Sequence, residues 1–515
     1  MIDTIIEAAT IYDGIGTVPF QTDVALVGDR IALIGSLADR DARERVAANG
    51  LALAPGFIDV HAHTDDLWLA DGRCLSKIHQ GVTTEIGGNC GSSVAPPAAD
   101  APWRDLDDFF SAVQSSGVAL NVATLVGLGT TRERVVGERD GRLDPTELRA
   151  ECDLVRSAVE QGALGVSSGL MYVPSRYADR DELVACAAAA REAGKALYAT
   201  HLRSEGDALL QAVDEALEIA RRADIAVQFS HHKAAGKKNW GKVERSLETI
   251  ARARVVGLAA HADVYPYTAT CTRLDTILPE DALEGGTEAT LERLADPATS
   301  TALALRLSLD RGDADWHDIA ISTVASERNA DLQGLRLDDI ARGRHQSPAR
   351  AALDLLREER LAVEAIFFSL SEDDVATVLS ADFVTIGSDA SARAHDGPTA
   401  RGLPHPRTFG CFPRIFGRFV RGRNTLEIGE AIRRMTSLAA DTFGIAERGR
   451  IELGAYADLV LFDRNAIVDT ATYEQPYAYP RGIEHVWVNG RQVIANGHST
   501  GARPGRVLRG GRAGA

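Results

Sequence analysis

The chain has 515 residues, of which 45% are hydrophobic and 25% charged, and its formal net charge is −17 at pH 7. This composition is typical of a globular protein with more than one structural unit, and the acidic balance argues against nucleic-acid binding, which needs a basic face. No apolar run approaches membrane-spanning length, and six scattered cysteines without a secretory signal predict reduced thiols in the cytoplasm.

The N-terminal segment is predicted to be rich in β-strands. Asp23–Leu26 and Ile31–Ile34 alternate apolar and polar residues on either side of the sequence Val-Gly-Asp-Arg, which predicts a hairpin. We expect residues 1–54 to contribute these strands to a small β-sandwich domain.

Between residues 55 and 446, short apolar runs alternate with helical segments. The predicted helix Glu205–Ala223 repeats apolar residues at three- and four-residue spacing, which gives it one apolar face. Eight strands alternating with helices predict a (β/α)8 TIM-like barrel, with a doubly wound open sheet as the alternative. The predicted strands are Phe57–Val60, Thr83–Gly87, Asn121–Val126, Ala163–Ser167, Ala196–Thr200, Ile225–Ser230, Ala262–Tyr265 and Phe383–Ser388.

One stretch interrupts the regular repeat. The chain is charged and poor in clear strands between Thr272 and Pro348, so we expect an insertion at about residues 275–345, after the seventh strand. Leu361–Leu370 then reads as an extra strand. Either Ala262–Tyr265 or Ala365–Ser369 could be the seventh barrel strand.

The C-terminal segment is again β-rich. His485–Ile494 contains Asn-Gly between two β-branched runs, which is the strongest short hairpin signal. We expect residues 447–515 to complete the same small domain as residues 1–54, with Gly501–Ala515 as a surface tail.

Side chains of metal-ligand type follow five of the eight predicted strands. His61 and His63 are two residues apart in an extended segment, so both project to the same side. In a barrel the carboxyl ends of all strands meet at one face, where barrel enzymes have their active sites. The residues at these positions are His61, His63, Cys90, His201, His231, His232 and Asp389.

These residue types favour a particular metal. Imidazole, thiolate and carboxylate together suit Zn²⁺, whereas Ca²⁺ and Mg²⁺ prefer oxygen ligands. Zinc lowers the pKa of bound water from about 16 to about 7, which makes hydroxide available at neutral pH. The sequence therefore predicts a zinc site in which Asp389 is a ligand or near-ligand and a proton carrier.

Longer motifs extend over nearly the whole chain, among them PGFIDVHAHTDD, QGVTTEIGGNCGSSVAP, YATHLRSE, QFSHHKAAGKKNWG, DVYPYTA and HPRTFGCFPR. These stretches resemble the amidohydrolase superfamily, and more closely its N-acyl-D-amino-acid deacylase (D-aminoacylase) family. Many superfamily members bridge two metals with a carbamylated lysine on the fourth strand. Here that strand reads ALGVSSG and has no lysine, and Cys90 is the family's substitute ligand.

The resemblance implies a ligand set and a mechanism. The implied ligands of one tightly bound zinc are Cys90, His201 and His231, and those of a second, weaker site are His61, His63 and Asp389. His231 is preferred to His232 because the first histidine of SHHK matches the family motif. The implied reaction is hydrolysis of the amide bond of an N-acyl-D-amino acid by metal-activated water, with Asp389 as general base and then general acid.

The carboxylate of such a substrate needs local cations in an acidic chain. The resemblance assigns this role to Lys233 and Arg407, with Tyr265 as a hydroxyl donor and Tyr172 as a candidate pocket wall. One departure from the family is Cys271, at a position where a serine is common.

A second departure is the long polar segment between Asp389 and Arg407. It adds Arg393, His395 and Arg401 near the predicted site, which could alter selectivity toward an acidic side chain or form only a longer surface loop.

Two other functions fit parts of the pattern. One is hydrolysis of a cyclic amide, such as a hydantoin or dihydropyrimidine, or of a β-linked dipeptide, but the Lys233 and Arg407 pair and GNCG disfavour it. The other is a non-catalytic scaffold, against which the full set of expected ligands argues. The expected partner is a small molecule, and the sequence specifies no oligomeric state.

Overall fold

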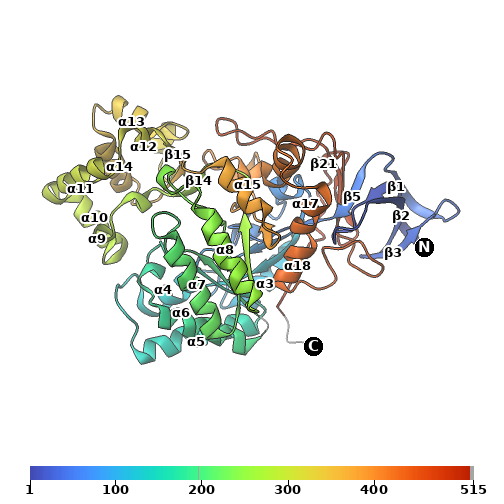
Figure 1. The fold of residues 1–515 in the computed structure, drawn as a ribbon, viewed down its shortest axis with the longest axis horizontal. Coiled ribbons are helices and arrows are strands. Elements are labelled where there is room, and N and C mark those ends of the chain that lie inside the picture. The colour runs from blue at the N-terminus through green and yellow to red at the C-terminus, as the bar shows by residue number, and fades with distance from the viewer. Residues whose placement is uncertain (195, 511–515) are drawn as a thin grey trace.

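The computed structural model describes residues 1–194 and 196–510. A parallel barrel occupies the centre of the molecule (Figure 1). A β-sheet built from both ends of the chain lies on one side of the barrel, and a helical insertion lies on the other. No helix in the described part of the chain combines the length and the hydropathy that a membrane crossing needs.

The barrel has eight parallel strands, as predicted, and is not an open sheet. Its strands are β6 (Phe57–Asp59), β7 (Val82–Gly87), β8 (Asn121–Thr124) continued by β9 (Val126–Gly127), β10 (Gly165–Gly169), β11 (Leu197–His201), β12 (Ala226–Phe229), β13 (Ala260–Val264) and β17 (Val384–Ile386). β13 pairs with both β12 and β17, which makes it the seventh strand. The first and last strands meet through a parallel bridge between Ala62 and Ala390, which closes the ring.

Helices surround the barrel strands. They include α3 (Leu106–Ser116), α4 (Leu128–Val136), α5 (Pro145–Glu160), α6 (Arg180–Ala193), α7 (Leu209–Ala223), α8 (Lys242–Val255), α15 (Glu372–Ser380), α17 (Ile428–Met435) and α18 (Ser437–Phe443). The apolar face predicted for α7 is buried, as its three- and four-residue spacing requires. The helix begins at Leu209 and not at Glu205, because the Glu205 side chain turns into the central cavity to contact a histidine and a lysine.

The insertion is wider than residues 275–345. An antiparallel sheet in the order β14 (Thr270–Arg273), β16 (Val363–Phe367), β15 (Ile319–Val324) frames it. Its helices are α9 (Glu280–Leu283), α10 (Gly286–Ala295), α11 (Pro297–Asp310), α12 (Asp313–His317), α13 (Leu337–Gly343) and α14 (Pro348–Glu358). The sequence of β14 is Thr-Cys-Thr-Arg, with no buried apolar residue, so periodicity gives no sign of this strand.

Both termini build one continuous nine-stranded sheet. Its strands are β1 (Ile2–Ile11), β2 (Phe20–Val27), β3 (Arg30–Gly35), β4 (Ala42–Ala47), β5 (Ala52–Pro55), β18 (Leu459–Phe462), β19 (Ile483–Val488), β20 (Arg491–Ala495) and β21 (His498–Ser499). Antiparallel pairing of β5 with β18 joins the N-terminal and C-terminal strands. Both predicted hairpins form, and Asn489 and Gly490 have φ angles of 48° and 76°, as a type I′ turn requires.

The chain after Gly501 is not a free tail in its described part. The Leu508 amide donates to the Val122 carbonyl oxygen (2.7 Å) at the start of the barrel, and the Gly505 amide donates to Val118 (2.8 Å). Residues 503–510 therefore form a C-terminal anchor on the barrel, while residues 511–515 lie outside the described residues. The glycine-rich composition concealed this role because Val507 and Leu508 are its only large aliphatic residues.

Candidate metal centre

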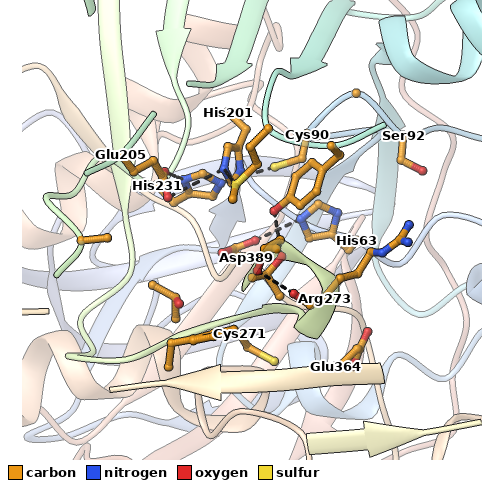
Figure 2. Close-up of a pocket in the computed structure, with 18 of the residues that line it drawn as sticks. His63, Cys90, Ser92, His201, Glu205, His231, Cys271, Arg273, Glu364 and Asp389 are labelled. Carbon is orange, nitrogen blue, oxygen red and sulfur yellow. Dashed lines mark hydrogen bonds and ion pairs between the residues drawn. The ribbon is translucent and has the colours of Figure 1, made fainter. Parts of the chain in front are cut away.

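A cavity of about 870 Å³ opens at the carboxyl ends of the barrel strands. One wall comes from the insertion, where β14 and β16 contribute Cys271, Arg273 and Glu364 (Figure 2). The opposite side carries His63 and Cys90 from the first two strands. The cavity thus lies between the barrel and the inserted sheet.

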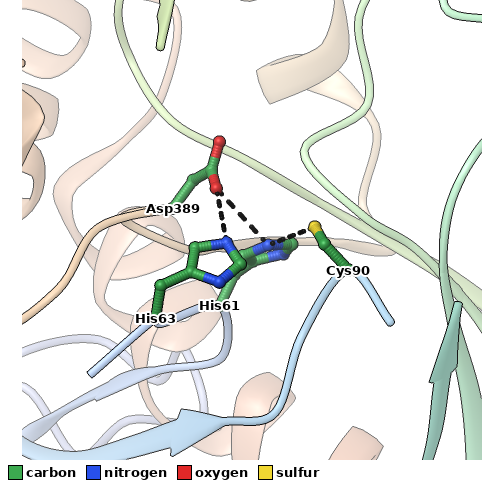
Figure 3. A group of neighbouring side chains, drawn as sticks. All are labelled: His61, His63, Cys90 and Asp389. Atoms are coloured by element: carbon green, nitrogen blue, oxygen red, sulfur yellow. Dashed lines mark hydrogen bonds and ion pairs between the residues drawn. The ribbon is translucent and has the colours of Figure 1, made fainter. Parts of the chain in front are cut away.

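One group of potential ligands joins the first, second and last strands. Ligand atoms of His61, His63, Cys90 and Asp389 all lie within 4.8 Å of one another (Figure 3). Asp389 Oδ1 is 3.0 Å from His63 Nε2 and 3.5 Å from His61 Nε2. Cys90 Sγ is 3.3 Å from His61 Nε2.

A second group shares Cys90 with the first. Ligand atoms of Cys90, His201 and His231 also lie within 4.8 Å of one another. Cys90 Sγ is 3.4 Å from His231 Nε2, and His201 and His231 stack edge to face. His232 is not part of the group, because its Nε2 is 2.7 Å from the Ser246 hydroxyl.

Asp263 is a candidate functional residue that the sequence interpretation missed. Its Oδ1 lies 3.2 Å from His61 Nδ1 and accepts a 2.8 Å hydrogen bond from the His231 amide. A carboxylate on the far nitrogen of a metal-binding histidine fixes the ring tautomer and orientation. The available signal was its position two residues before Tyr265 on the seventh strand, which directs both side chains to one face.

Glu205 is a second residue that was missed. Its Oε1 lies 3.0 Å from His231 Nδ1 and accepts a 2.6 Å hydrogen bond from Lys233 Nζ. Its Oε2 is 3.7 Å from His201 Nε2. The only signal was its position four residues after His201 in the motif YATHLRSE.

Electrostatics favour the ionised forms of both anionic ligands. Burial alone would raise the pKa of Cys90, but positive charge on His61 and His231 outweighs it and lowers the thiol pKa well below its usual range. Burial also opposes ionisation of Asp389, but Arg407 and His231 hold its pKa well below the ordinary value. A thiolate, imidazoles and a carboxylate within ligand distance form a donor set that fits Zn²⁺.

The two predicted cations are both engaged by acids. Arg407 Nη1 is 2.8 Å from Asp389 Oδ2, and Lys233 bonds to Glu205 as described above. The Arg407 guanidinium also lies over the Tyr265 ring, with its central carbon 4.5 Å from the ring centroid. The buried Tyr265 hydroxyl has no hydrogen-bond partner within the described residues.

Tyr172, the predicted pocket wall, and Cys271, the departure from the family, both line the cavity. The Tyr172 hydroxyl is 2.9 Å from Thr272 Oγ1. Burial raises the pKa of the Cys271 thiol to about 12, so this side chain stays protonated and can donate only a weak hydrogen bond.

Of the three charged or polar residues in the long loop, the cavity lining includes Arg393 only. His395 instead packs against Tyr479 with ring centroids 4.2 Å apart. Arg401 contributes its carbonyl oxygen, which accepts from Arg393 Nη1 at 2.6 Å.

The fold and the clustered ligands are those of a metal-dependent barrel enzyme. The chain belongs to the amidohydrolase family, whose model matches residues 44–494.

Full-length relatives have deacylase names. The N-acyl-D-aspartate deacylase of Alcaligenes xylosoxydans xylosoxydans is 36% identical, over 98% of this chain and 95% of the relative. The N-acyl-D-glutamate deacylase of the same organism is 34% identical, over 99% of this chain and 96% of the relative.

Solved structures with related names also match this chain over nearly its full length. N-acyl-D-glutamate deacylase from Bordetella bronchiseptica, complexed with zinc and a phosphonate inhibitor that mimics the tetrahedral intermediate, has a TM-score of 0.84 at 33% identity, with 99% of each chain covered. A D-aminoacylase structure has a TM-score of 0.83 at 32% identity, with 99% of this chain and 100% of that chain covered. A dihydropyrimidinase from Brevibacillus agri shares only the fold, at 17% identity and a TM-score of 0.58.

Proposed function

We propose that this protein is a zinc-dependent hydrolase that cleaves the amide bond of N-acyl-D-amino acids to a carboxylate and a free D-amino acid. The observation that carries the proposal is the position of Asp389, whose two oxygens contact a histidine of the metal cluster and Arg407. Asp389 is thus placed to carry a proton beside the histidines, and it also contacts Arg407, a group suited to binding a carboxylate. The names of the full-length relatives support this substrate class.

The ligands divide into two sets around the shared thiolate. In this proposal Cys90, His201 and His231 hold one tightly bound zinc, and His61, His63 and Asp389 line a weaker second position. The assignment is supported by the exposure of one ring in the second set, since the His63 side chain is 30% exposed whereas His201 and His231 are only 4% and 2% exposed. When bound, zinc polarises the acyl carbonyl and makes hydroxide available at neutral pH.

Asp389 moves the proton. Its ionised carboxylate accepts a proton at Oδ1 from the attacking water and then donates it to the amide nitrogen, so that the amine leaves neutral. Its lowered pKa keeps it ionised before the reaction begins. Arg407 on Oδ2 leaves Oδ1 as the oxygen that faces the histidines.

Three donors bind the substrate's carboxylate in this proposal. The Arg407 fork suits a planar carboxylate, Lys233 adds a second positive charge, and Tyr265 supplies a buried hydroxyl with no partner within the described residues. Tyr172 forms the wall beside them. We also propose that the protein acts on this small molecule in the cytoplasm, without a nucleic-acid or membrane partner; its six free thiols support a reducing compartment.

A hydrolysis screen tests the proposal. Purified protein is given N-acetyl derivatives of aspartate, glutamate, leucine and methionine in both D and L forms, and the release of free amine is measured. We expect release from D substrates only, its loss after chelation, and its recovery when zinc is added back. Turnover of L substrates alone, or full activity in chelator after metal analysis finds no zinc, would contradict the proposal.

A further inference from the structure

The turn that carries Asp389 has an unfavourable backbone conformation. Asp389 has a φ angle of 52°, in the left-handed region that residues with a Cβ atom rarely occupy. Such a conformation persists only where surrounding contacts hold it. One of these contacts is the Asp389 amide, which donates to the His61 carbonyl oxygen at 2.8 Å.

Lys77 supplies further contacts from beneath the turn. This residue belongs to α2 (Leu75–Ile78), and its side chain is completely buried. Its Nζ donates to the Ser388 hydroxyl and the Ala390 carbonyl, both at 2.8 Å, and to Asp59 Oδ2 at 2.6 Å. These three bonds use all three protons of the ammonium, and two of them are to the neighbours of Asp389.

Asp59 connects the same turn to the first strand. Its Oδ1 accepts from the Ser388 amide at 2.8 Å and from the His61 amide at 3.3 Å. Its Oδ2 accepts from the Ser388 hydroxyl at 2.6 Å as well as from Lys77. One carboxylate therefore fixes the backbone of His61 relative to the turn that presents Asp389.

Stability alone is a weak explanation for this buried cation. Removing a lysine and its partners from water costs free energy that their attraction often fails to recover, so apolar replacements of such pairs are frequently neutral. Lys77 is also fully covered and is not among the residues that line the cavity, so it cannot contact a substrate. What the contacts do specify is the geometry of the Asp389 turn.

We infer that Lys77 is a positioning residue that, together with Asp59, holds the Asp389 carboxylate against His61 and His63 for proton transfer. The inference rests on the proposed function, in which Asp389 carries the proton. A misplacement of a reacting group by about 1 Å can cost on the order of 100-fold in rate, so loss of these contacts acts on turnover and not on substrate binding.

The test compares Lys77→Met with a matched control, Arg132→Met. Arg132 is an equally buried cation, paired with Glu182 on the outer helices and outside the cavity lining. We expect Lys77→Met to lower kcat about 10- to 100-fold with KM and zinc content within about twofold of wild type. Arg132→Met should lower the melting temperature without a selective loss of kcat. Equal kcat in Lys77→Met and wild type, or equal loss of kcat in both variants, would overturn the inference.

A milder variant covers the case in which Lys77→Met does not fold. Ser388→Ala keeps both charges and removes only the hydroxyl between Lys77 and Asp59, and we expect kcat to fall about 3- to 10-fold. Unchanged kcat would overturn the inference.

The proposed function fails separately, if wild type hydrolyses none of the N-acyl-D-amino acids. Crystal structures of Lys77→Met and Ser388→Ala then test the positioning role directly. An Asp389 carboxylate in the same position as in wild type would refute it.

Discussion

At the residue scale, Cys90 is the side chain on which both ligand groups depend. Its sulfur lies 3.3 Å from His61 Nε2 and 3.4 Å from His231 Nε2, so it sits between the two sets. Its φ angle of 53° is unusual for a non-glycine residue and directs the thiol into the cavity. Loss of this one atom would therefore remove a shared donor from both candidate ligand groups.

We predict that Cys90→Ala lowers zinc affinity by about tenfold or more, because the site loses its only thiolate. Zinc content after dialysis, measured by elemental analysis, checks this. Cys186→Ala is the matched control, since Cys186 is fully buried on α6 and belongs to neither ligand group. Equal zinc content in both variants would rule out a thiolate ligand.

The side chains that meet at the strand ends could be predicted because strand position alone brings them together. Their hydrogen-bond partners could not, since Asp263, Glu205 and Lys77 act through contacts between residues distant in sequence. Lys77 illustrates the limit, because its contact with Ser388 joins residues 311 positions apart and its own helix is a single turn. Nothing local in the sequence distinguishes it from a surface lysine.

At the element scale, helix α5 carries a buried acid, Glu151, that forms no ion pair within the described residues. Glu151 is 1% exposed, and its Oε1 accepts a 3.0 Å hydrogen bond from Thr131, while Oε2 has no partner within the described residues. Burial, and then repulsion from Glu182, raises the pKa of Glu151 to about 8. In the unfolded chain this carboxyl has its ordinary pKa of about 4.3.

The sign of the effect follows from proton binding. Between these two pKa values the folded state keeps a proton that the unfolded state has lost, so rising pH destabilises the fold. We predict that Glu151→Gln removes this pH-dependent loss of stability. The difference in free energy of unfolding between the variant and wild type should shift in the variant's favour by roughly 1–3 kcal/mol from pH 5.5 to pH 8.5. Thermal unfolding at both pH values measures it. Glu160→Gln, at the exposed end of the same helix, is the control, and an equal pH dependence in both variants would contradict the prediction.

Helices and strands could be predicted where the apolar periodicity was strong. The prediction failed where tertiary contacts determined the bounds or the pairing of an element. The buried face of α7 was predicted correctly from its apolar spacing. Its first residue was not, because the Glu205 side chain points into the cavity and the helix begins at Leu209. Two apolar runs competed for the seventh strand, and the choice depends on which one pairs in parallel with β12. Pairing partners are not encoded in the local pattern.

At the scale of the whole molecule, the C-terminal anchor binds the barrel on the face opposite the cavity. Its amides bond to Val118 and Val122, at the start of β8, and Asn489 Nδ2 donates to the Pro504 carbonyl at 2.8 Å. Residues at the amino-terminal face of a barrel contribute to stability, whereas those at the carboxyl-terminal face contribute to catalysis. The anchor therefore belongs to the stabilising face.

We predict that a chain ending at Ala502 melts about 5 °C or more below the full-length protein, because it loses these bonds and the packing of Leu508. Its KM for an N-acyl-D-amino acid should stay within about twofold of the full-length value. Calorimetry and steady-state kinetics measure the two quantities. A truncated protein with full thermal stability, or with a large change in KM alone, would show that the anchor has a different role.

The closure of the barrel has a consequence for how the protein is made. His63 and Asp389 are 326 residues apart in sequence, yet they meet at the seam between the first and last barrel strands. During synthesis from the N-terminus, His63 can meet Asp389 only after nearly four hundred residues have been translated. One edge of β5 waits longer still, because it pairs with β18 near the end of the chain. The proposed weaker metal position, to which Asp389 belongs, is therefore completed late in biosynthesis, whereas Cys90, His201 and His231 of the proposed tight site are all translated much earlier.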